Sequence, residues 1–498
     1  MGQYLLGIDN GGTVTKAALY DLDGVEVAVA SARTETLYPQ PGQIERDLDK
    51  FWAGNAGVIA EVIRRARVDT SRIAGISVTG HGCGMYMVAE DGSPSYNGII
   101  STDSRASAYV KRYYQDGTFQ QVLPLTCQSI WASQPAALLP WFRDNMPEVL
   151  HRTRWVLSCK DYIRYKLTGV PRVEVTDYSG TSLLNIWKLD FDPKLLELFG
   201  ISYLADKFPQ VCQSADICGQ VTPEAAAVTG LKAGTPVAGG LFDVSACAIA
   251  SGIVDEDTFC LIAGTWSINE YISRAPVQAP DLFMSSAYCM PGYWLILEGS
   301  PTSASNLEWF VREFIETSGK NPYDECNELV QSIPPEESQI IFLPFLFGSN
   351  AGPSASSGFL GLHGWHRKAH LLRAIFEGVV FSHRTHIDRL MNYREPAKRV
   401  RIAGGAARSS VWVKIFADAL QLPIEVTASE ELGALGAAIC AGVGVGLFIS
   451  FPEAVSHMVH VSRTVDPDPA VGGIYEEKYR KYQDGVTTLG PLWDRHEL

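Results

Sequence analysis

Two short turns in this sequence have the composition of phosphate-binding loops. The first follows a strand-like apolar run and reads Asp9-Asn10-Gly11-Gly12-Thr13. Glycines in a tight turn let backbone N–H groups approach a phosphate with no Cβ in the way, and the Thr13 hydroxyl adds a donor. Asp9, at the strand end, has the oxygen chemistry to hold a water on Mg²⁺, which usually keeps several waters. A purely structural hairpin is the alternative for such an Asn-Gly turn.

The second turn, Ala263-Gly264-Thr265-Trp266-Ser267, repeats this chemistry without the acid. Two such turns facing one another across a cleft would hold a triphosphate from both sides, which favours the functional interpretation. Other nucleotide-binding motifs are excluded by their own spacing. The sequence has no GxxxxGK[ST] loop, and Gly80-x-Gly82-x-Gly84 departs from the GxGxxG of dinucleotide-binding folds.

A carboxylate and a further glycine pair also follow strand-like runs. Asp243 comes after Ala238-Gly239-Gly240-Leu241-Phe242, where it would start a helix facing a cleft. Capping a helix N-terminus is the more common use of such an aspartate. Gly404-Gly405, ahead of Ser409, would let an adenine ring lie against the backbone, although a tight strand-to-helix connection explains it equally well.

Five histidines stand near one another in the sequence and raise the question of a metal centre. Gly361 and Gly364 make a poor helix context for His363 and His366, and no paired carboxylate stands at ligand spacing. A structural or surface role is therefore favoured. The residues are His363, His366, His370, His383 and His386.

The N-terminal part of the chain predicts a mixed sheet of an α/β fold. Three strand-like runs separated by tight turns are followed by a helical pattern and a fourth, buried strand. This order is typical of a mixed sheet flanked by helices. The segments are 4–8, 14–20, 25–30, 48–65 and 73–78.

The strand–turn–strand unit recurs in the second half of the chain, at 258–263 and 266–273. The repetition predicts two related domains, 1–252 and 253–460, with a boundary near Ser251–Glu256.

Further elements are expected after this unit. The patterns predict helices over 371–390 and 412–420 and a strand over 400–402. From Val461, several Pro and Gly residues predict a tail, 461–498, packed on the surface.

Composition and charge exclude several classes of protein. The chain has 498 residues, 46% hydrophobic and 19% charged, and this composition disfavours disorder of the whole chain. A net charge of −14 disfavours nucleic acid as a partner, because phosphate backbones need a positive surface. Anionic small ligands stay allowed, since backbone N–H groups and a metal supply local positive charge.

Cysteine usage and hydropathy bear on the compartment. Ten scattered cysteines with no CxxC pair indicate buried thiols in a reducing compartment, and no secretory signal is recognised, so we expect a cytoplasmic protein. The segment Gly433–Ser450 carries no charge and approaches the length of a membrane span. Its five glycines and the absence of Lys or Arg at its flanks favour a buried helix followed by a turn.

These motifs, with several others in the same order, resemble the FGGY family of carbohydrate kinases over almost the whole chain. That family includes glycerol, xylulose, ribulose, rhamnulose and gluconate kinases. The first signature departs from the family pattern at Leu138, where Lys is usual. The matching segments are Gly7–Thr13, Pro41–Asp47, Asp103–Arg105, Ser133–Asn145, Lys160–Gly169, Ser357–Glu377, Gly404–Ser409 and Gly433–Ala438.

The resemblance implies an α/β, two-domain actin/hexokinase/Hsp70-like (ribonuclease H-like) ATPase fold. ATP with Mg²⁺ would lie mainly on the C-terminal domain and the sugar mainly on the N-terminal one. Asp243 matches the catalytic base, and a carboxylate at its ordinary pKa of about 4 is ionised at neutral pH and suffices.

The remaining site residues are carried over position by position. Asp9 would act on Mg²⁺ through water, and His81, Asp103 and Arg105 are candidate sugar contacts, with support of the pocket wall as the alternative. The residues expected to bind ATP are Asp9, Gly11, Gly12, Thr13, Gly264, Thr265, Gly404, Gly405 and Ser409.

The expected activity is transfer of the ATP γ-phosphate to a primary hydroxyl of a small ketose or polyol. Gly80-His81-Gly82-Cys83-Gly84 differs from the Gln-Met-His-Gly type of xylulose kinases and the Arg-Glu pair of glycerol kinases. The chain is most similar to the L-xylulose kinase subgroup, so a pentulose is expected. The alternatives are a tetritol, tetrulose, glycerol or sugar-acid kinase and, in another class, an actin-like nucleotide switch. No nucleic acid or membrane partner is expected, and a homodimer is considered.

Overall fold

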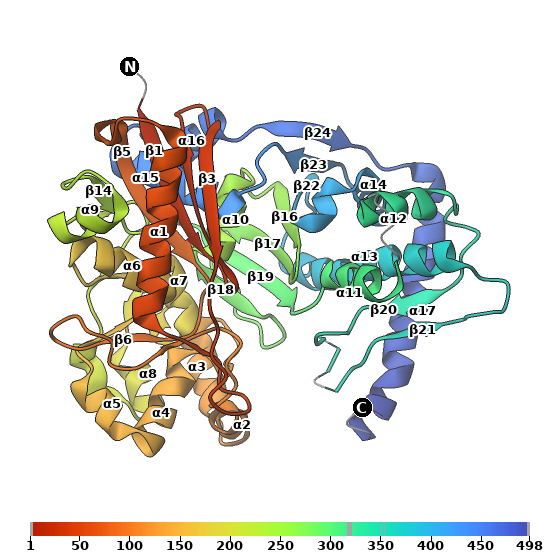
Figure 1. Cartoon of the computed structure of the whole chain (residues 1–498). Helices are drawn as coiled ribbons and strands as arrows, with labels where there is room; N and C mark the ends of the chain where they lie inside the picture. The colour runs from red at the N-terminus through yellow and green to blue at the C-terminus, as the bar shows by residue number, and fades with distance from the viewer. Residues whose placement is uncertain (1–2, 316–320, 350, 353, 496–498) are drawn as a thin grey trace. The chain divides into compact units, whose positions relative to one another are not determined.

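The computed structural model describes the chain except residues 1–2, 316–320, 350, 353 and 496–498. Its contacts divide the chain into two compact units (Figure 1). The first unit comprises Met1–Val254, Ile272–Ile296 and Glu431–His460, and the second comprises Asp255–Tyr271, Leu297–Glu430 and Val461–Leu498. The domain limits 1–252, 253–460 and 461–498 stay a prediction beside this division.

The sheet of the first unit is mixed, as the sequence predicts. Its strand order is β13-β14-β5-β1-β2-β3, and β15 pairs with β5. Strand β1 runs antiparallel to β2 and parallel to β5. The strands are β1 Tyr4–Asn10, β2 Val14–Tyr20, β3 Glu26–Arg33, β5 Ile73–Gly80, β13 Ile217–Gln220, β14 Pro236–Ala238 and β15 Leu241–Phe242.

Three helices, described next, pack against this sheet or against one another beside it. Helix α1 (Leu48–Ala66) packs on β2 and β3, and helix α15 (Leu432–Gly444) packs on β1 and β5. The charge-free segment therefore forms a buried helix. Helix α10 (Asp243–Ala250) crosses α15 so closely that a Cβ on Gly436 would lie 2.2 Å from the Ala246 carbonyl oxygen. Only glycine permits this backbone approach.

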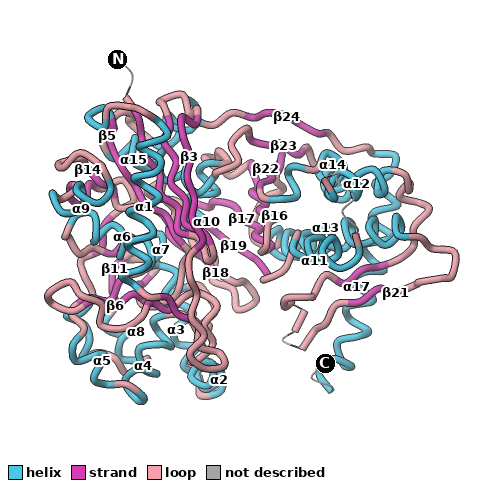
Figure 2. Tube along the Cα trace, in the orientation of Figure 1, coloured by secondary structure: helices cyan, strands magenta, loops and turns pink. Residues whose placement is uncertain are grey.

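The second sheet repeats the core of the first. Strand β16 runs antiparallel to β17 and parallel to β22, as β1 does to β2 and β5. The strand order is β18-β19-β17-β16-β22-β23-β24 (Figure 2). The predicted internal repeat is thus found at the level of topology. The strands are β16 Thr258–Ala263, β17 Ser267–Ser273, β18 Met284–Ala287, β19 Trp294–Ser300, β22 Arg399–Ala403, β23 Ile424–Thr427 and β24 Val461–Val465.

The C-terminal stretch is more regular than the predicted tail. Strand β24 joins β23, and helix α17 follows over Pro469–Arg495. Tyr475, Tyr479 and Tyr482 recur at helical spacing and are buried. Their spacing is the signal that the glycines and prolines of this segment obscured.

The remaining elements complete the two units. The other helices are α2 Ser107–Gln115, α3 Thr118–Thr126, α4 Pro135–Asn145, α5 Pro147–Arg152, α6 Cys159–Thr168, α7 Val175–Tyr178, α8 Pro193–Leu198, α9 Pro223–Thr229, α11 Ser305–Phe314, α12 Pro322–Gln331, α13 Lys368–Met391, α14 Ser410–Leu420 and α16 Phe451–Met458. The other strands are β4 Glu45–Arg46, β6 Tyr86–Val88, β7 Gly98–Ile99, β8 Trp155–Leu157, β9 Val173–Glu174, β10 Leu184–Asn185, β11 Asp190–Phe191, β12 Val211–Cys212, β20 Ile341–Leu343 and β21 Gly358–Leu360.

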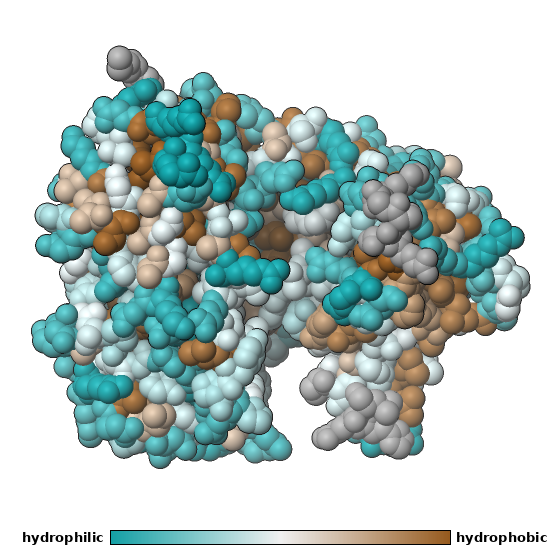
Figure 3. Space-filling view, viewed as in Figure 1, coloured by the Kyte–Doolittle hydropathy of each residue, from teal (hydrophilic) through white to brown (hydrophobic). Residues whose placement is uncertain are grey.

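The visible face of the first unit is mostly hydrophilic, with apolar residues scattered among polar ones (Figure 3). Such single exposed apolar residues are ordinary for a folded protein. A membrane-crossing helix is not found among the described residues.

Candidate active site

Three parallel strands of the first unit end in register and bring the predicted catalytic residues to one edge of the sheet. Asn10 of β1 and Phe242 of β15 both pair with Gly80 of β5. Asp9 precedes the end of β1, while His81 and Asp243 directly follow β5 and β15. Ligands of such sheets bind outside the carboxyl ends of the strands. The strand pairing therefore gathers residues that lie far apart in the sequence.

The first glycine turn uses part of its backbone for its own closure. Gly11 donates its N–H to the Val14 carbonyl at 3.1 Å, so the groups left to face a phosphate are those of Gly12 and Thr13, which are exposed. The buried Arg46 donates from Nη2 to the Gly12 carbonyl at 2.8 Å. Because C=O and N–H of a trans peptide point in opposite directions, this bond turns the Thr13 N–H away from Arg46.

Asp9 lies against the first turn of helix α15. A Cβ on Gly433 would lie 2.4 Å from Asp9 Oδ2, so the carboxylate occupies the space that a larger residue would fill. Burial raises the pKa of Asp9 to about 6; the Lys16 ammonium lowers it, and the Glu431 carboxylate raises it. Lys16 and Glu431 themselves form an ion pair at 2.6 Å.

Asp243 begins helix α10 and accepts a hydrogen bond from the Val244 N–H at 2.8 Å. Its residue surface is partly exposed, yet loss of water around the carboxyl group raises its pKa well above the ordinary value. The nearby carboxylates of Asp9 and Asp177 raise the pKa further. The expectation of an ordinary pKa for Asp243 is therefore wrong. Carboxyl groups that lie this close together favour the binding of a cation or the uptake of a proton.

His81 is buried and both of its ring nitrogens have partners. Nε2 lies 2.9 Å from the Tyr86 hydroxyl, and Nδ1 lies 3.3 Å from the Gly82 carbonyl oxygen. Since a carbonyl only accepts, we assign the proton to Nδ1, and the Tyr86 hydroxyl donates to Nε2. Burial and the charge of Arg46 lower the pKa of His81 to about 3, so the imidazole is neutral.

Replacing His81 by glutamine should make the protein less sensitive to mild acid. As pH falls below 6.5 the unfolded chain takes up a proton, whereas the folded state resists until about 3. The contribution of neutral His81 to the free energy of unfolding is fully present above the pKa of the unfolded chain. It falls as the pH is lowered, by about 2 kcal/mol between pH 7 and pH 5. Urea unfolding at these two pH values should therefore show a loss smaller by about that amount in the variant. Equal losses would contradict the buried neutral imidazole.

Asp103 and Arg105 are engaged with each other and with Glu45. Arg105 Nη2 lies 2.7 Å from Glu45 Oε1 and 2.9 Å from Asp103 Oδ2, and all three side chains are buried. Asp103 also accepts the Ile44 N–H at 2.7 Å. These bonds tie the loop ahead of β4 to the loop after β7. These bonds support the alternative role in the pocket wall for Asp103, whereas Arg105 Nη1 is buried with no hydrogen-bond partner among the described residues. Direct sugar contact stays a prediction for both residues.

In the second unit the other two predicted nucleotide loops lie side by side. Ile262 of β16 pairs with Ala403 of β22, so Gly264 and Gly404 follow adjacent strand ends. Gly404 has a φ of +85°, and a Cβ on it would lie 2.7 Å from the Ala263 carbonyl oxygen. Both reasons require glycine there.

The residues around these two glycines differ in how free they are. Thr265 and Gly405 are exposed, and the Gly264 carbonyl accepts the Ala304 N–H at 2.8 Å. Ser409 Oγ accepts the Trp412 N–H at 3.0 Å and donates to Asn327 Oδ1 at 2.6 Å. Ser409 thus caps helix α14, and its contact with adenosine stays a prediction.

The five histidines lie in two settings. His370, His383 and His386 are buried in helix α13, where His383 forms hydrogen bonds with Ser267, Ser303 and Asn269. His363 and His366 stand in the loop before this helix. Over the described part of the chain, groups of His, Cys, Asp and Glu placed to hold a metal ion are not found. The hydrogen bonds of His383 give it a structural role in the interior of the second unit.

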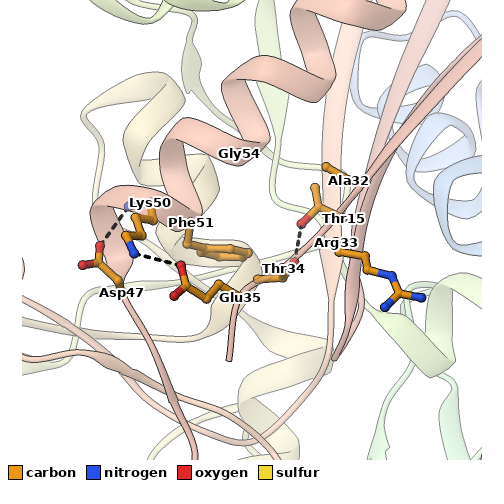
Figure 4. A pocket seen from close by; sticks show the side chains of 9 residues that line it. All are labelled: Thr15, Ala32, Arg33, Thr34, Glu35, Asp47, Lys50, Phe51 and Gly54. Carbon is orange, nitrogen blue, oxygen red and sulfur yellow. Dashed lines mark hydrogen bonds and ion pairs between the residues drawn. The ribbon is translucent and has the colours of Figure 1, made fainter. Parts of the chain in front are cut away.

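A pocket of about 190 Å³ lies between α1 and the ends of β2 and β3 (Figure 4). Two of its charged side chains form an ion pair, with Lys50 Nζ 2.8 Å from Glu35 Oε2, and Asp47 accepts the backbone N–H of Lys50. None of its lining residues is among the predicted site residues. The pocket nevertheless adjoins the end of β1, because Thr15, which lines it, donates a hydrogen bond to Asn10 Oδ1 at 3.0 Å.

Most of the chain matches a known family in sequence. The model of the FGGY family of carbohydrate kinases matches with its N-terminal domain over residues 4–250 and with its C-terminal domain over 260–445. This chain belongs to that family. It is a carbohydrate kinase with the actin/hexokinase/Hsp70-like ATPase fold, and ATP is its phosphoryl donor. The predicted fold class and enzyme class are confirmed.

Individual relatives and structures agree with this assignment. The chain is 40% identical to the L-xylulose/3-keto-L-gulonate kinase of Escherichia coli K12, with 98% of each chain covered. It is 26% identical to the erythritol kinase of Brucella abortus, covering 99% of this chain and 98% of that one. The xylulose kinase of Rhodospirillum rubrum superposes with a TM-score of 0.90 at 28% identity, over 99% and 100% of the two chains.

Sequence reasoning missed residues that act through the predicted ones. Arg46 lies in the quoted segment Pro41–Asp47, but its bond to Gly12 is a tertiary contact that a single sequence does not reveal. Lys160 and Glu174 likewise meet only in the fold. The one available signal was a basic residue within an otherwise buried segment. Charged residues are rarely fully buried unless paired, so such a residue indicates a buried partner.

Proposed function

We propose that the protein transfers the γ-phosphate of ATP to a primary hydroxyl of a pentulose such as L-xylulose. The observation that carries the substrate is the 40% identity, over 98% of both chains, to a kinase named for L-xylulose and 3-keto-L-gulonate. Two further relatives, from Pasteurella multocida and Haemophilus influenzae, are named as probable L-xylulose kinases at 38% and 34% identity.

Asp243 acts as the base in this proposal. The hydroxyl oxygen forms a bond to the γ-phosphorus, the bond from phosphorus to the bridging oxygen of ADP breaks, and the hydroxyl proton passes to Asp243. Phosphoryl transfer rests mainly on positioning and charge stabilisation, so the proton moves late. Asp243 must be ionised before it takes this proton, so its raised pKa opposes the step unless positive charge lies nearby; a cation bound at the same edge would lower the pKa again.

Mg²⁺ would be held at Asp9 through water. The fit is chemical: Asp9 offers carboxylate oxygens, which Mg²⁺ prefers, and the neighbouring Asp243 adds negative charge to the same edge. When bound, the ion neutralises charge on the phosphates. Of the chain's own groups, Gly12 and Thr13 would bind phosphate from the first turn, Gly264 and Thr265 from the second, and Gly404 and Gly405 the adenosine.

Coupled measurement of ADP release across a panel of acceptors tests this function. The panel contains L-xylulose, D-xylulose, erythritol, glycerol and 3-keto-L-gulonate. We expect the highest kcat/KM for L-xylulose. Preference for 3-keto-L-gulonate would favour the second candidate, a sugar-acid kinase, which the printed name of the same relative supports. ADP release that no acceptor accelerates would favour an actin-like switch and contradict the proposal.

Two further predictions accompany the function. From the cysteine usage we predict a cytoplasmic location. The assembly that we consider is a homodimer. Sedimentation of the purified protein with ATP present tests the assembly directly.

A further inference from the structure

A buried hydroxyl holds the backbone directly ahead of Asp243. The Phe242 N–H donates to Thr176 Oγ1 at 2.9 Å, and Phe242 is the residue from which helix α10 starts. Thr176 lies in α7, far from Phe242 in the sequence, and is fully buried. This bond is therefore a tertiary constraint on the turn that presents the carboxylate.

The Thr176 hydroxyl is itself oriented by Glu174. It donates to Glu174 Oε2 at 2.8 Å, and the Thr176 N–H donates to Oε1 at 2.9 Å. A hydroxyl has one proton and two lone pairs. With the proton committed to the carboxylate, a lone pair is left to accept the Phe242 N–H, so the direction of both bonds is determined.

Glu174 is anchored in turn by buried partners. Its Oε1 accepts from Ser214 Oγ at 2.7 Å, and its Oε2 lies 3.2 Å from Lys160 Nζ. Burial lowers the pKa of Lys160, but the carboxylates of Asp161, Glu174 and Asp177 more than offset this, so the pKa ends above its ordinary value and the ammonium stays charged. A satisfied network of this kind is rigid, because removing one partner leaves a buried polar group unpaired.

We propose that Thr176, oriented by Glu174, is a positioning residue for Asp243. This inference rests on the proposed role of Asp243 as the base. The chain of bonds runs from the Lys160–Glu174 pair through the Thr176 hydroxyl to the Phe242 N–H, one residue before the carboxylate. Because misplacement of a reacting group by about 1 Å costs on the order of 100-fold in rate, a loosened turn lowers turnover without removing any group that touches the substrate.

The test compares Thr176→Val, which removes the hydroxyl at constant shape, with Thr176→Ser, which keeps it. We expect kcat to fall about 10–100-fold in T176V and to stay within about threefold of the wild type in T176S. The KM for ATP should stay within about twofold in both variants, since ATP is bound by other residues. Hydrogen exchange of the Phe242 amide should speed up in T176V and not in T176S.

Thr229→Val is the matched control. Thr229 is also a fully buried threonine, its hydroxyl donates to the Ala225 carbonyl and accepts the Leu231 N–H, and it closes helix α9. It should lose similar stability with kcat unchanged. Equal falls of kcat in T176V and T229V, or unchanged kcat with faster exchange in T176V, would overturn the positioning role. Retained turnover in Asp243→Asn would instead refute the base assignment, so the two failures are distinguishable.

Discussion

Replacing Asp243 by asparagine should lower kcat by about 1,000-fold or more while the fold and ATP binding persist. Asparagine has the shape of aspartate but takes no proton at neutral pH. Loss of the base therefore appears in kcat, and the dissociation constant of ATP, measured by calorimetry, should stay within about threefold. Turnover near the wild-type value would refute Asp243 as the base.

The same substitution should raise the melting temperature. Burial and the carboxylates of Asp9 and Asp177 raise the pKa of Asp243, so its ionised form opposes folding at neutral pH. A neutral amide removes that penalty. Asp388→Asn is the matched control, because burial also raises the pKa of Asp388, which accepts from the Tyr479 hydroxyl in the second unit. It should leave kcat unchanged.

The sequence predicts most of what forms locally. The turn after β1, helix α1 and helix α13 follow from periodicity and glycine placement, and the structure has them within a few residues of the predicted limits. The repeat of β1 and β2 in β16 and β17 was also visible. The segment after Val461 was not, because its glycines and prolines hide the spacing of the buried tyrosines.

What the sequence lacks is the set of contacts that orient the predicted residues. Two hydrogen bonds join segments that are distant in the sequence. Arg46 donates one to the Gly12 carbonyl, and Thr176 accepts the other from the Phe242 N–H. The raised pKa of Asp243 likewise arises from tertiary neighbours and from burial that motif spacing does not report. Residue type indicates what a group can do, while the fold decides which charge stands beside it.

Replacing Gly433 by alanine should impair turnover through Asp9 alone. A Cβ there would lie 2.4 Å from Asp9 Oδ2, and the carboxylate is the end of a side chain that can rotate away. The helix gains from alanine as it loses this contact, so we expect the free energy of unfolding to change by less than about 1 kcal/mol. Displacement of Asp9 should lower kcat by about 10–100-fold. Gly57→Ala, in helix α1 with open space around its Cβ, is the matched control and should leave kcat unchanged.

A double-mutant cycle separates this effect from a general disturbance of helix α15. Asp9→Ala should lower kcat by about 100-fold or more, since it removes the carboxylate proposed to act on the metal. If Gly433→Ala acts by moving that carboxylate, it has nothing left to move in the Asp9→Ala background. The double variant should then match Asp9→Ala, giving a coupling energy of about 1–3 kcal/mol at the level of kcat. Multiplicative losses would show that Gly433 acts on the site by another route, such as the crossing of α15 with α10, which carries Asp243.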